Sequence, residues 1–140
     1  PISFSKAYGL AGLRAGFVIA STEVADFVRR TSTPFGVSSL AQAAVVASLQ
    51  PQAERELLER VDALVTERER VIAALSAQGW KIEPQQANFF WLAAGERTLD
   101  IKTACEAAGV AVRPFPEGLR ITIGETEANN RIIEVLGTFA

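Results

Sequence analysis

The sequence predicts an α/β protein in which one long amphipathic helix separates two regions of different organisation. Residues 51–78 carry apolar side chains at three- and four-residue spacing and charged side chains on the other face, as surface helices do. After this helix, short apolar strands alternate with two short helices, an order typical of a small α/β domain. Before it, strand-like and helical stretches surround a loop that is rich in small and polar residues.

Composition indicates a globular protein and excludes several functional classes. The chain has 140 residues, 49% of them hydrophobic and 21% charged, with a net charge of -2. Its basic residues are interleaved with acidic ones, so we expect no nucleic-acid partner. No apolar run approaches the roughly 18 residues of a membrane span, so we expect no membrane association. A single cysteine favours a reducing, cytoplasmic location.

Missing residue types restrict the chemistry further. Without any histidine, the chain alone cannot supply a Ser-His-Asp triad or a histidine-ligated metal. Cys105 has no cysteine partner and lies in an apolar helical pattern, so we expect a small core residue and no metal site. Acid–base chemistry must therefore come from Lys, Asp, Glu or Tyr.

In the region before the long helix, we expect two strands and two helices. Ser21 or Thr22 suits the cap of the first helix, and Ser38 or Ser39 suits the start of the second. The second helix is apolar almost all round, which predicts that it is buried. The expected elements are strands at 2–5 and 15–20, a helix ending at Arg30, a loop at 31–37 and a helix at 40–49.

The region after the long helix predicts a strand-helix-strand-strand-helix order, with an antiparallel sheet under two helices. Gly79 and Gly109 suit helix ends, and Thr126 suits the cap of the last helix. The expected elements are strands at 88–93, 110–113 and 119–123 and helices at 98–108 and 126–136. We therefore divide the chain into residues 1–50, the connecting helix 51–78 and a small α/β domain at 79–140.

The run from Ser3 to Gly16 holds the strongest chemical signal. The hydroxyls of Ser3 and Ser5 and the fork of Arg14 suit a phosphate, which an arginine can bind bidentately. Lys6 supplies an amine that can act as a nucleophile. Taken singly, the same residues fit a solvated lysine, a surface arginine and a glycine-rich turn.

A second signal lies in the strand that contains Arg120. Leu119, Ile121 and Ile123 share one face of this strand, and Arg120 shares the other face with Thr122. An arginine in a strand otherwise built for burial is costly unless it meets an anion. Taken alone, the alternation favours an exposed sheet face or a structural salt bridge.

Both signals resemble motifs of one family. The run Ser-Phe-Ser-Lys-Ala-Tyr-Gly-Leu-Ala-Gly-Leu-Arg-Ala-Gly resembles the lysine segment of fold-type-I aminotransferases of class I/II, which use pyridoxal phosphate. The stretch 118–124 (Gly-Leu-Arg-Ile-Thr-Ile-Gly) resembles their strand that grips the substrate carboxylate. Residues 33–42, 86–92 and 112–115 extend the likeness to the branch of histidinol-phosphate and aromatic-amino-acid aminotransferases. Val-Arg-Pro-Phe at 112–115 is closer to the aromatic (phenylalanine) type.

The resemblance implies a role for each of these side chains. Lys6 would hold pyridoxal 5'-phosphate as a Schiff base and move the substrate proton. Ser3, Ser5 and Arg14 would anchor the phosphate, with Ser5 the better candidate for direct contact. Arg120 would bind the α-carboxylate of amino-acid and 2-oxo-acid substrates. Arg113 would meet a side-chain anion or be a rim charge, and Tyr8 would be structural.

The resemblance also implies what the chain lacks. The chain contains no Met and begins at Pro1, inside a predicted strand, so we expect the carboxy-terminal portion of a longer protein. Residues 1–50 would then end the large domain. The family's pyridine-nitrogen acid, its ring-stacking aromatic and a tyrosine from the partner subunit of a homodimer all precede the lysine. We therefore expect the chain alone to be inactive.

Three functions remain open at this point. The first is transamination of an aromatic amino acid with a 2-oxo acid, and the second is transamination of histidinol phosphate. The third, of a different class, is a non-catalytic phosphate-binding module in which Lys6 only neutralises an anion. Within the enzyme class, the resemblance also leaves open other lysine-dependent reactions of the same fold, such as decarboxylation.

Overall fold

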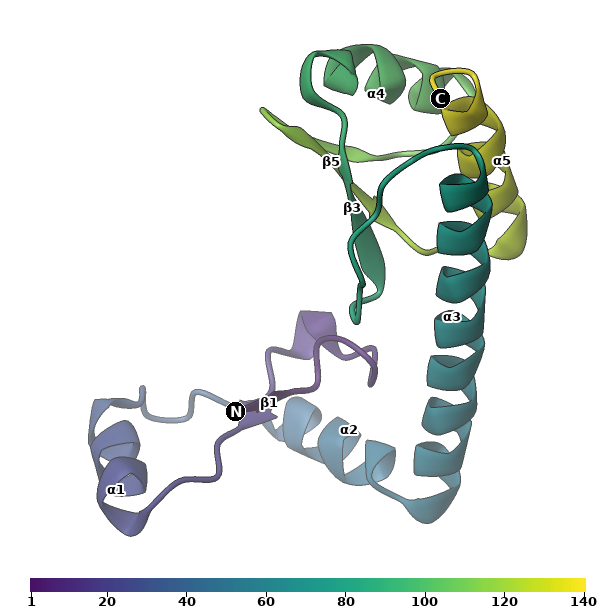
Figure 1. Ribbon diagram of the computed structural model, residues 1–140. Helices are drawn as coiled ribbons and strands as arrows, with labels where there is room; N and C mark the ends of the chain where they lie inside the picture. Colours follow the sequence, from purple (N-terminus) through teal and green to yellow (C-terminus); the bar gives the residue numbers. More distant parts are fainter. The chain divides into compact units, whose positions relative to one another are not determined.

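The computed structural model describes residues 1–140 and divides into two compact units, Pro1–Val61 and Asp62–Ala140. The division falls within helix α3 (Pro51–Ala77), which is the long helix expected at 51–78 (Figure 1). With a rise of about 1.5 Å per residue, this helix is about 40 Å long. No helix of the structure combines the length and the apolar character that a membrane crossing requires.

The first unit contains a two-stranded antiparallel sheet and two short helices. Strand β1 (Ile2–Ser3) pairs with β2 (Gly16–Phe17), and a 3-10 turn, η1 (Ala11–Leu13), lies between them. Both strands are shorter than expected. Strand β1 ends at Ser3 because Phe4 and Ser5 already belong to the turn that starts the loop, and β2 ends at Phe17, the last residue that pairs with β1. Helices α1 (Thr22–Thr31) and α2 (Ser39–Ser48) follow.

Serine side chains start both short helices of this unit. The Ser21 Oγ accepts a hydrogen bond from the Val24 N–H at 3.5 Å, and the Ser38 Oγ accepts one from the Ala41 N–H at 3.1 Å. Each bond satisfies an amide that has no partner inside its helix. The first candidate of each expected pair, Ser21 and Ser38, is therefore the cap.

The expectation that the second helix is buried is wrong for this chain. Only Ala41 of α2 is buried, whereas Leu40 and Val46 are 69% and 62% exposed. The core of the unit is small: Phe4, Ala15 and Ala41, with Tyr8, Leu10, Leu13 and Val45 packed against them. A helix that is apolar on all sides needs neighbours on all sides, and this unit supplies them on one side only.

The second unit is a three-stranded antiparallel sheet covered by helices. The strand order is β3-β5-β4, formed by β3 (Phe89–Ala93), β4 (Arg113–Phe115) and β5 (Gly118–Thr122). Helices α4 (Thr98–Ala107) and α5 (Thr126–Gly137) complete the expected strand-helix-strand-strand-helix order, with a 3-10 turn, η2 (Gly95–Arg97), before α4.

Two boundaries in this unit differ from the expectation. The strand expected at 110–113 lies at Arg113–Phe115, because its position is fixed by pairing with β5 and not by its own apolar run. Pro114 is tolerated there since β4 is an edge strand. Thr126 is the first helical residue of α5, and Glu125 occupies the cap position without a side-chain bond.

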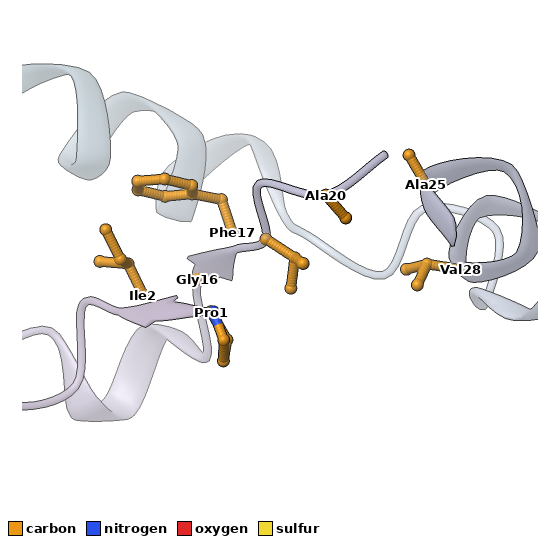
Figure 2. A pocket seen from close by; sticks show the side chains of 8 residues that line it. Pro1, Ile2, Gly16, Phe17, Ala20, Ala25 and Val28 are labelled. Carbon is orange, nitrogen blue, oxygen red and sulfur yellow. The ribbon is translucent and has the colours of Figure 1, made fainter. Parts of the chain in front are cut away.

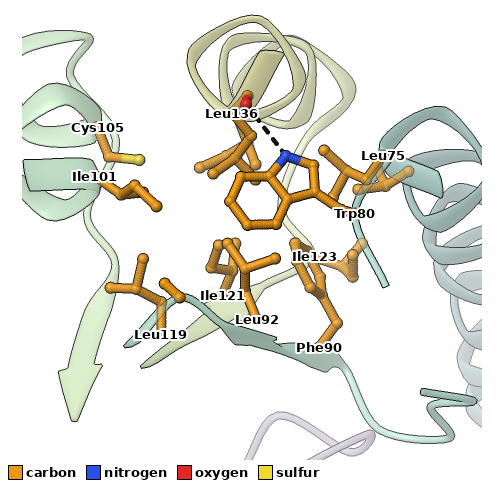
Figure 3. Packing of buried hydrophobic residues seen from close by; sticks show 13 residues of the cluster. Leu75, Trp80, Phe90, Leu92, Ile101, Cys105, Leu119, Ile121, Ile123 and Leu136 are labelled. Carbon is orange, nitrogen blue, oxygen red and sulfur yellow. Dashed lines mark hydrogen bonds between the residues drawn. The ribbon is translucent and has the colours of Figure 1, made fainter. Parts of the chain in front are cut away.

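One face of the sheet forms the main core with the helices. Phe90 and Leu92 of β3 and Leu119 and Ile121 of β5 are at most 2% exposed and belong to one cluster with Leu75, Ile101, Cys105 and Leu136 (Figure 3). Ile132 of α5 belongs to the same cluster. The indole Nε1 of Trp80 donates a hydrogen bond to the Leu136 carbonyl at 3.1 Å, so its one polar group is satisfied inside the core. The expected alternation of β5 and the burial of Cys105 are confirmed.

Candidate functional site

The loop between β1 and β2 brings Ser5 and Arg14 together. Pairing of the two strands closes its ends, and the Phe4 N–H donates to the Ala15 carbonyl at 3.1 Å. The Leu10 N–H donates back to the Phe4 carbonyl at 2.9 Å. These bonds, together with burial of Phe4, fold the run from Ser3 to Gly16 into one compact loop.

Arg14 and the two serines form a polar cluster in this loop. The Arg14 Nη1 donates to the Ser5 Oγ at 3.3 Å and to the Ala11 carbonyl at 2.7 Å. The Ser5 N–H donates to the Ser3 Oγ at 3.1 Å. Arg14 adopts a left-handed backbone conformation, with φ of 52°, and it forms no ion pair. The cluster therefore carries an uncompensated positive charge beside two hydroxyls.

Lys6 lies directly beside this cluster in the chain. It is exposed, and its ammonium group forms no ion pair with the acidic residues of the chain. The Lys6 carbonyl accepts the Gly9 N–H at 2.8 Å, which closes the turn that follows. The ring of Tyr8 packs 4.6 Å from that of Phe4, in agreement with a structural role.

The first unit also contains an apolar hollow of about 370 Å³, which no pattern in the sequence predicted. Figure 2 shows Ile2 and Phe17 of the strands and Ala25 and Val28 of α1 around it. Its lining carries no charged side chain and no hydroxyl. Serine, lysine and arginine of the polar cluster are absent from this lining, so the hollow does not suit a phosphate.

In the second unit, Arg120 and Arg113 lie opposite one another on neighbouring strands. Register pairs Arg120 of β5 with Arg113 of β4 on one side and with Trp91 of β3 on the other. All three therefore lie on the sheet face away from the helices. Like charges placed directly opposite destabilise a sheet, and neither arginine has an acidic partner in the chain.

An aromatic ring lies beside each of the two guanidinium groups. The Cζ of Arg120 lies 5.2 Å from the ring centroid of Phe89, and that of Arg113 lies 5.3 Å from the ring centroid of Phe115. The rings of Trp91 and Phe115 are 5.6 Å apart. These rings were not predicted as neighbours of the arginines, although the two-residue periodicity of the strand places Phe89 and Trp91 on one face of the sheet.

Arg120 retains a donor without a partner. Its Nε is buried and makes no hydrogen bond within the chain. Buried donors are nearly always satisfied, so an unsatisfied one on a cationic group indicates an acceptor supplied by a ligand or another chain. A carboxylate meets this requirement, since its two oxygens match the guanidinium fork.

The donor set of the first unit fits the phosphate of pyridoxal phosphate. A dianionic phosphate needs positive charge and several donors, which Arg14 and the hydroxyls of Ser3 and Ser5 provide. The adjacent Lys6 amine fits the aldehyde of the same cofactor. The structure thus brings Ser3, Ser5 and Arg14 together beside Lys6 in one unit, and Arg113 with Arg120 in the other.

Comparison with known proteins identifies the family. Residues 2–136 match the family described as aminotransferase class I and II. A protein named aromatic amino acid aminotransferase from Streptomyces avermitilis is 61% identical over 138 residues, covering 98% of this chain and 38% of that protein. One of the same name from Thermobifida fusca is 56% identical, with the same coverage.

A solved structure shares the fold along nearly the whole chain. The histidinol-phosphate aminotransferase from Sinorhizobium meliloti, in complex with pyridoxal-5'-phosphate, matches with a TM-score of 0.77 and 25% identity. The match covers 99% of this chain and 41% of that one.

The chain belongs to the class I and II aminotransferases, and its α/β fold is that of part of a fold-type-I enzyme. It spans about 38% of the length of the curated relatives that it matches.

Proposed function

We propose that this chain is part of a pyridoxal-phosphate-dependent aminotransferase that transfers the amino group of an aromatic L-amino acid to a 2-oxo acid. The observation that carries the proposal is the loop in which Arg14 bonds Ser5 beside the unpaired amine of Lys6. The names of the relatives at 61% and 56% identity support the aromatic substrate class.

Each polar residue of the loop has a distinct task in this proposal. Arg14 and Ser5 hold the cofactor phosphate, and Ser3 supports Ser5 because its Oγ accepts the Ser5 backbone N–H. Lys6 would hold the cofactor through its Nζ, and the same atom, once free, would take the proton from the substrate α-carbon and pass it to the cofactor. Pyridoxal phosphate, when bound, withdraws electrons from the α-carbon so that this proton can leave.

Arg120 is the proposed anchor for the substrate. Its unpartnered Nε and the cationic fork bind the α-carboxylate and thereby fix the direction in which the amine and the α-carbon point. Arg113, directly opposite in the sheet, binds a second anionic group or remains a charge at the rim.

The rest of the site belongs, in this proposal, to portions that the chain does not span. Residues 1–50 end the large cofactor-binding domain, 51–78 connect it and 79–140 form the small domain. The remainder of the polypeptide and the partner subunit of a cytoplasmic homodimer complete the site. Large apolar side chains left exposed in the first unit, such as Ile19, Phe27 and Leu40, support such a covering.

Transamination of histidinol phosphate is the second candidate. The paired guanidinium groups of Arg113 and Arg120 favour it, because a phosphate ester also requires concentrated positive charge. The likeness to the Sinorhizobium meliloti enzyme points the same way, at lower identity than the aromatic relatives.

Assays of the complete enzyme with pyridoxal phosphate separate the candidates. We expect phenylalanine to be consumed with a kcat/KM well above that of histidinol phosphate, and a clear preference for the phosphate ester would contradict the aromatic assignment. Lys6→Ala removes the activity, while the exposed Lys81→Ala serves as a matched control and keeps it. Saturable phosphate binding without transamination of any amino acid would favour a non-catalytic module.

A further inference from the structure

Two consecutive residues of α3 hold two different segments at the same end of the sheet. Arg68, only 9% exposed, donates from Nη1 to the Ala87 carbonyl at 3.1 Å, just before strand β3. Glu67 accepts from the Nδ2 of Asn129 at 2.9 Å, and Asn129 in turn binds the segment just after β5. We call Glu67, Arg68 and Asn129 the α3 clamp.

Asn129 connects this clamp to the backbone of Gly124. Its Oδ1 accepts the Gly124 N–H at 3.0 Å, and its Nδ2 donates to the Gly124 carbonyl at 2.8 Å. The side chain is 2% exposed, and both of its amide hydrogens are used. A buried amide with this many bonds has one orientation, so the end of β5 is fixed relative to α3.

The two held segments also bind each other. The Ile123 N–H donates to the Asn88 carbonyl at 3.0 Å, and Phe89 pairs with Thr122 in the ladder. This is the end of the sheet where the guanidinium of Arg120 lies over the ring of Phe89. The clamp therefore fixes the two strand segments that carry Arg120 and its aromatic neighbour.

The acidic member of the clamp, Glu67, is also held in place by an ion pair with Arg70. Arg70 donates to both carboxylate oxygens of Glu67, at 2.8 and 2.7 Å, and to the Oδ1 of Asn130 at 2.8 Å. The bonds from Arg70 and Asn129 lower the pKa of Glu67 to about 2. At neutral pH, Glu67 is thus a charged acceptor for Asn129.

We propose that the α3 clamp is a positioning device that aims the guanidinium of Arg120 at the substrate carboxylate. The inference rests on the proposed carboxylate-binding role of Arg120. The Nε of Arg120 is buried and has no partner. Whether it reaches the substrate carboxylate depends on where the backbone of β5 places this donor. Displacement of an anchoring group by about 1 Å can weaken a productive contact by roughly 100-fold.

The test compares a carboxylate ligand with its neutral isostere. In the complete enzyme, the dissociation constants of 3-phenylpropanoate and 3-phenylpropanamide are measured by titration calorimetry for the wild type and for Glu67→Ala, Asn129→Ala and Glu67→Gln. We expect the first two variants to lose roughly 10- to 100-fold of the preference for the carboxylate, while amide binding changes little. Glu67→Gln keeps an acceptor for Asn129 and restores most of the preference.

Controls make each outcome decisive. Glu69→Ala changes an exposed glutamate on the same helix and should leave both constants unchanged. If Asn129→Ala does not fold, as judged by circular dichroism, the partly exposed Glu67 still provides the test. Folded Glu67→Ala enzyme with wild-type preference would overturn the clamp, provided that Arg120→Lys abolishes the preference. If Arg120→Lys leaves the preference intact, the proposed role of Arg120 fails, and the clamp fails with it.

Discussion

Arg14 shows how a single side chain gives a loop its chemical character. Its backbone is left-handed, and its Nη1 donates to the Ala11 carbonyl and the Ser5 hydroxyl, so the exposed guanidinium is tied to the loop at two points. No carboxylate of the chain neutralises it. Such a preorganised cation costs little reorganisation when an anion binds.

At this scale the prediction concerns cofactor affinity. Arg14→Gln removes a charge-assisted contact to the cofactor phosphate, and we expect the dissociation constant of pyridoxal phosphate to rise roughly 10- to 100-fold. Titration of the complete apoenzyme, followed by absorbance, measures this constant. Arg30→Gln, an exposed arginine of the same unit without an ion pair, should not change it. An unchanged constant in Arg14→Gln would exclude Arg14 from the phosphate site.

Among the secondary-structure elements, β5 is the most tightly constrained strand. It is the central strand of its sheet, and Gly118 at its start allows the backbone of β3 to approach. A Cβ at Gly118 would lie 2.1 Å from the Leu92 carbonyl oxygen and 3.0 Å from the Cζ2 of Trp91. Since the first obstacle is backbone, a side chain there forces the two strands apart.

Gly118→Ala should therefore destabilise the protein by about 3 kcal/mol or more, at the upper end of overpacking effects. Thermal unfolding of the complete enzyme measures the loss. Gly124→Ala is the matched control, because its Cβ would meet only the Ala128 Cβ at 3.8 Å and the Asn129 Oδ1 at 3.9 Å. Equal unfolding temperatures for the two variants would show that β3 and β5 have room for a side chain at position 118.

Sequence periodicity predicted which helices and strands exist. It predicted less well how deeply a helix is buried and where a strand begins. The alternation in 119–123 gave the correct faces of β5, and Gly79 and Gly109 mark helix ends with φ of 102° and 75°. The start of β4 at Arg113 depends on pairing with Arg120, a contact with a distant segment that no local pattern contains. The exposure of α2 depends on which neighbours the unit supplies, which a local pattern does not report either.

For the molecule as a whole, Glu67 predicts how stability responds to acid. Its carboxyl has a pKa of about 2 in the folded protein, against an ordinary value of 4.5, mainly because of the bonds from Arg70 and Asn129. Between these values the unfolded chain binds a proton that the folded chain does not. Acidification therefore favours unfolding, and this contribution is complete above pH 4.5 and lost toward pH 2.

Thermal unfolding of the complete enzyme and of its Glu67→Gln variant between pH 6 and pH 3 tests this linkage. The wild type should be the more stable at pH 6, and the difference should shrink as the pH falls. A difference that is constant over this range would mean that the Glu67 carboxyl does not titrate as its contacts imply.

The candidate site was predictable from sequence only in part. The run from Ser3 to Gly16 contains its serines, lysine and arginine within one loop, so their proximity follows from short-range structure. The rings beside Arg120 and the clamp at Asn129 involve segments far apart in the chain. Such contacts are set by the tertiary fold, and they became visible only in the structure.

The most direct test of the account is the covalent attachment of pyridoxal phosphate to Lys6. The complete enzyme is incubated with pyridoxal phosphate, reduced with borohydride, digested and analysed by mass spectrometry. We predict a stable pyridoxyl adduct on the peptide that contains Lys6, no such adduct in Lys6→Ala, and an unchanged adduct in the control Lys81→Ala. Saturable binding of the cofactor with no adduct at Lys6 would contradict the proposal that this chain carries the catalytic lysine.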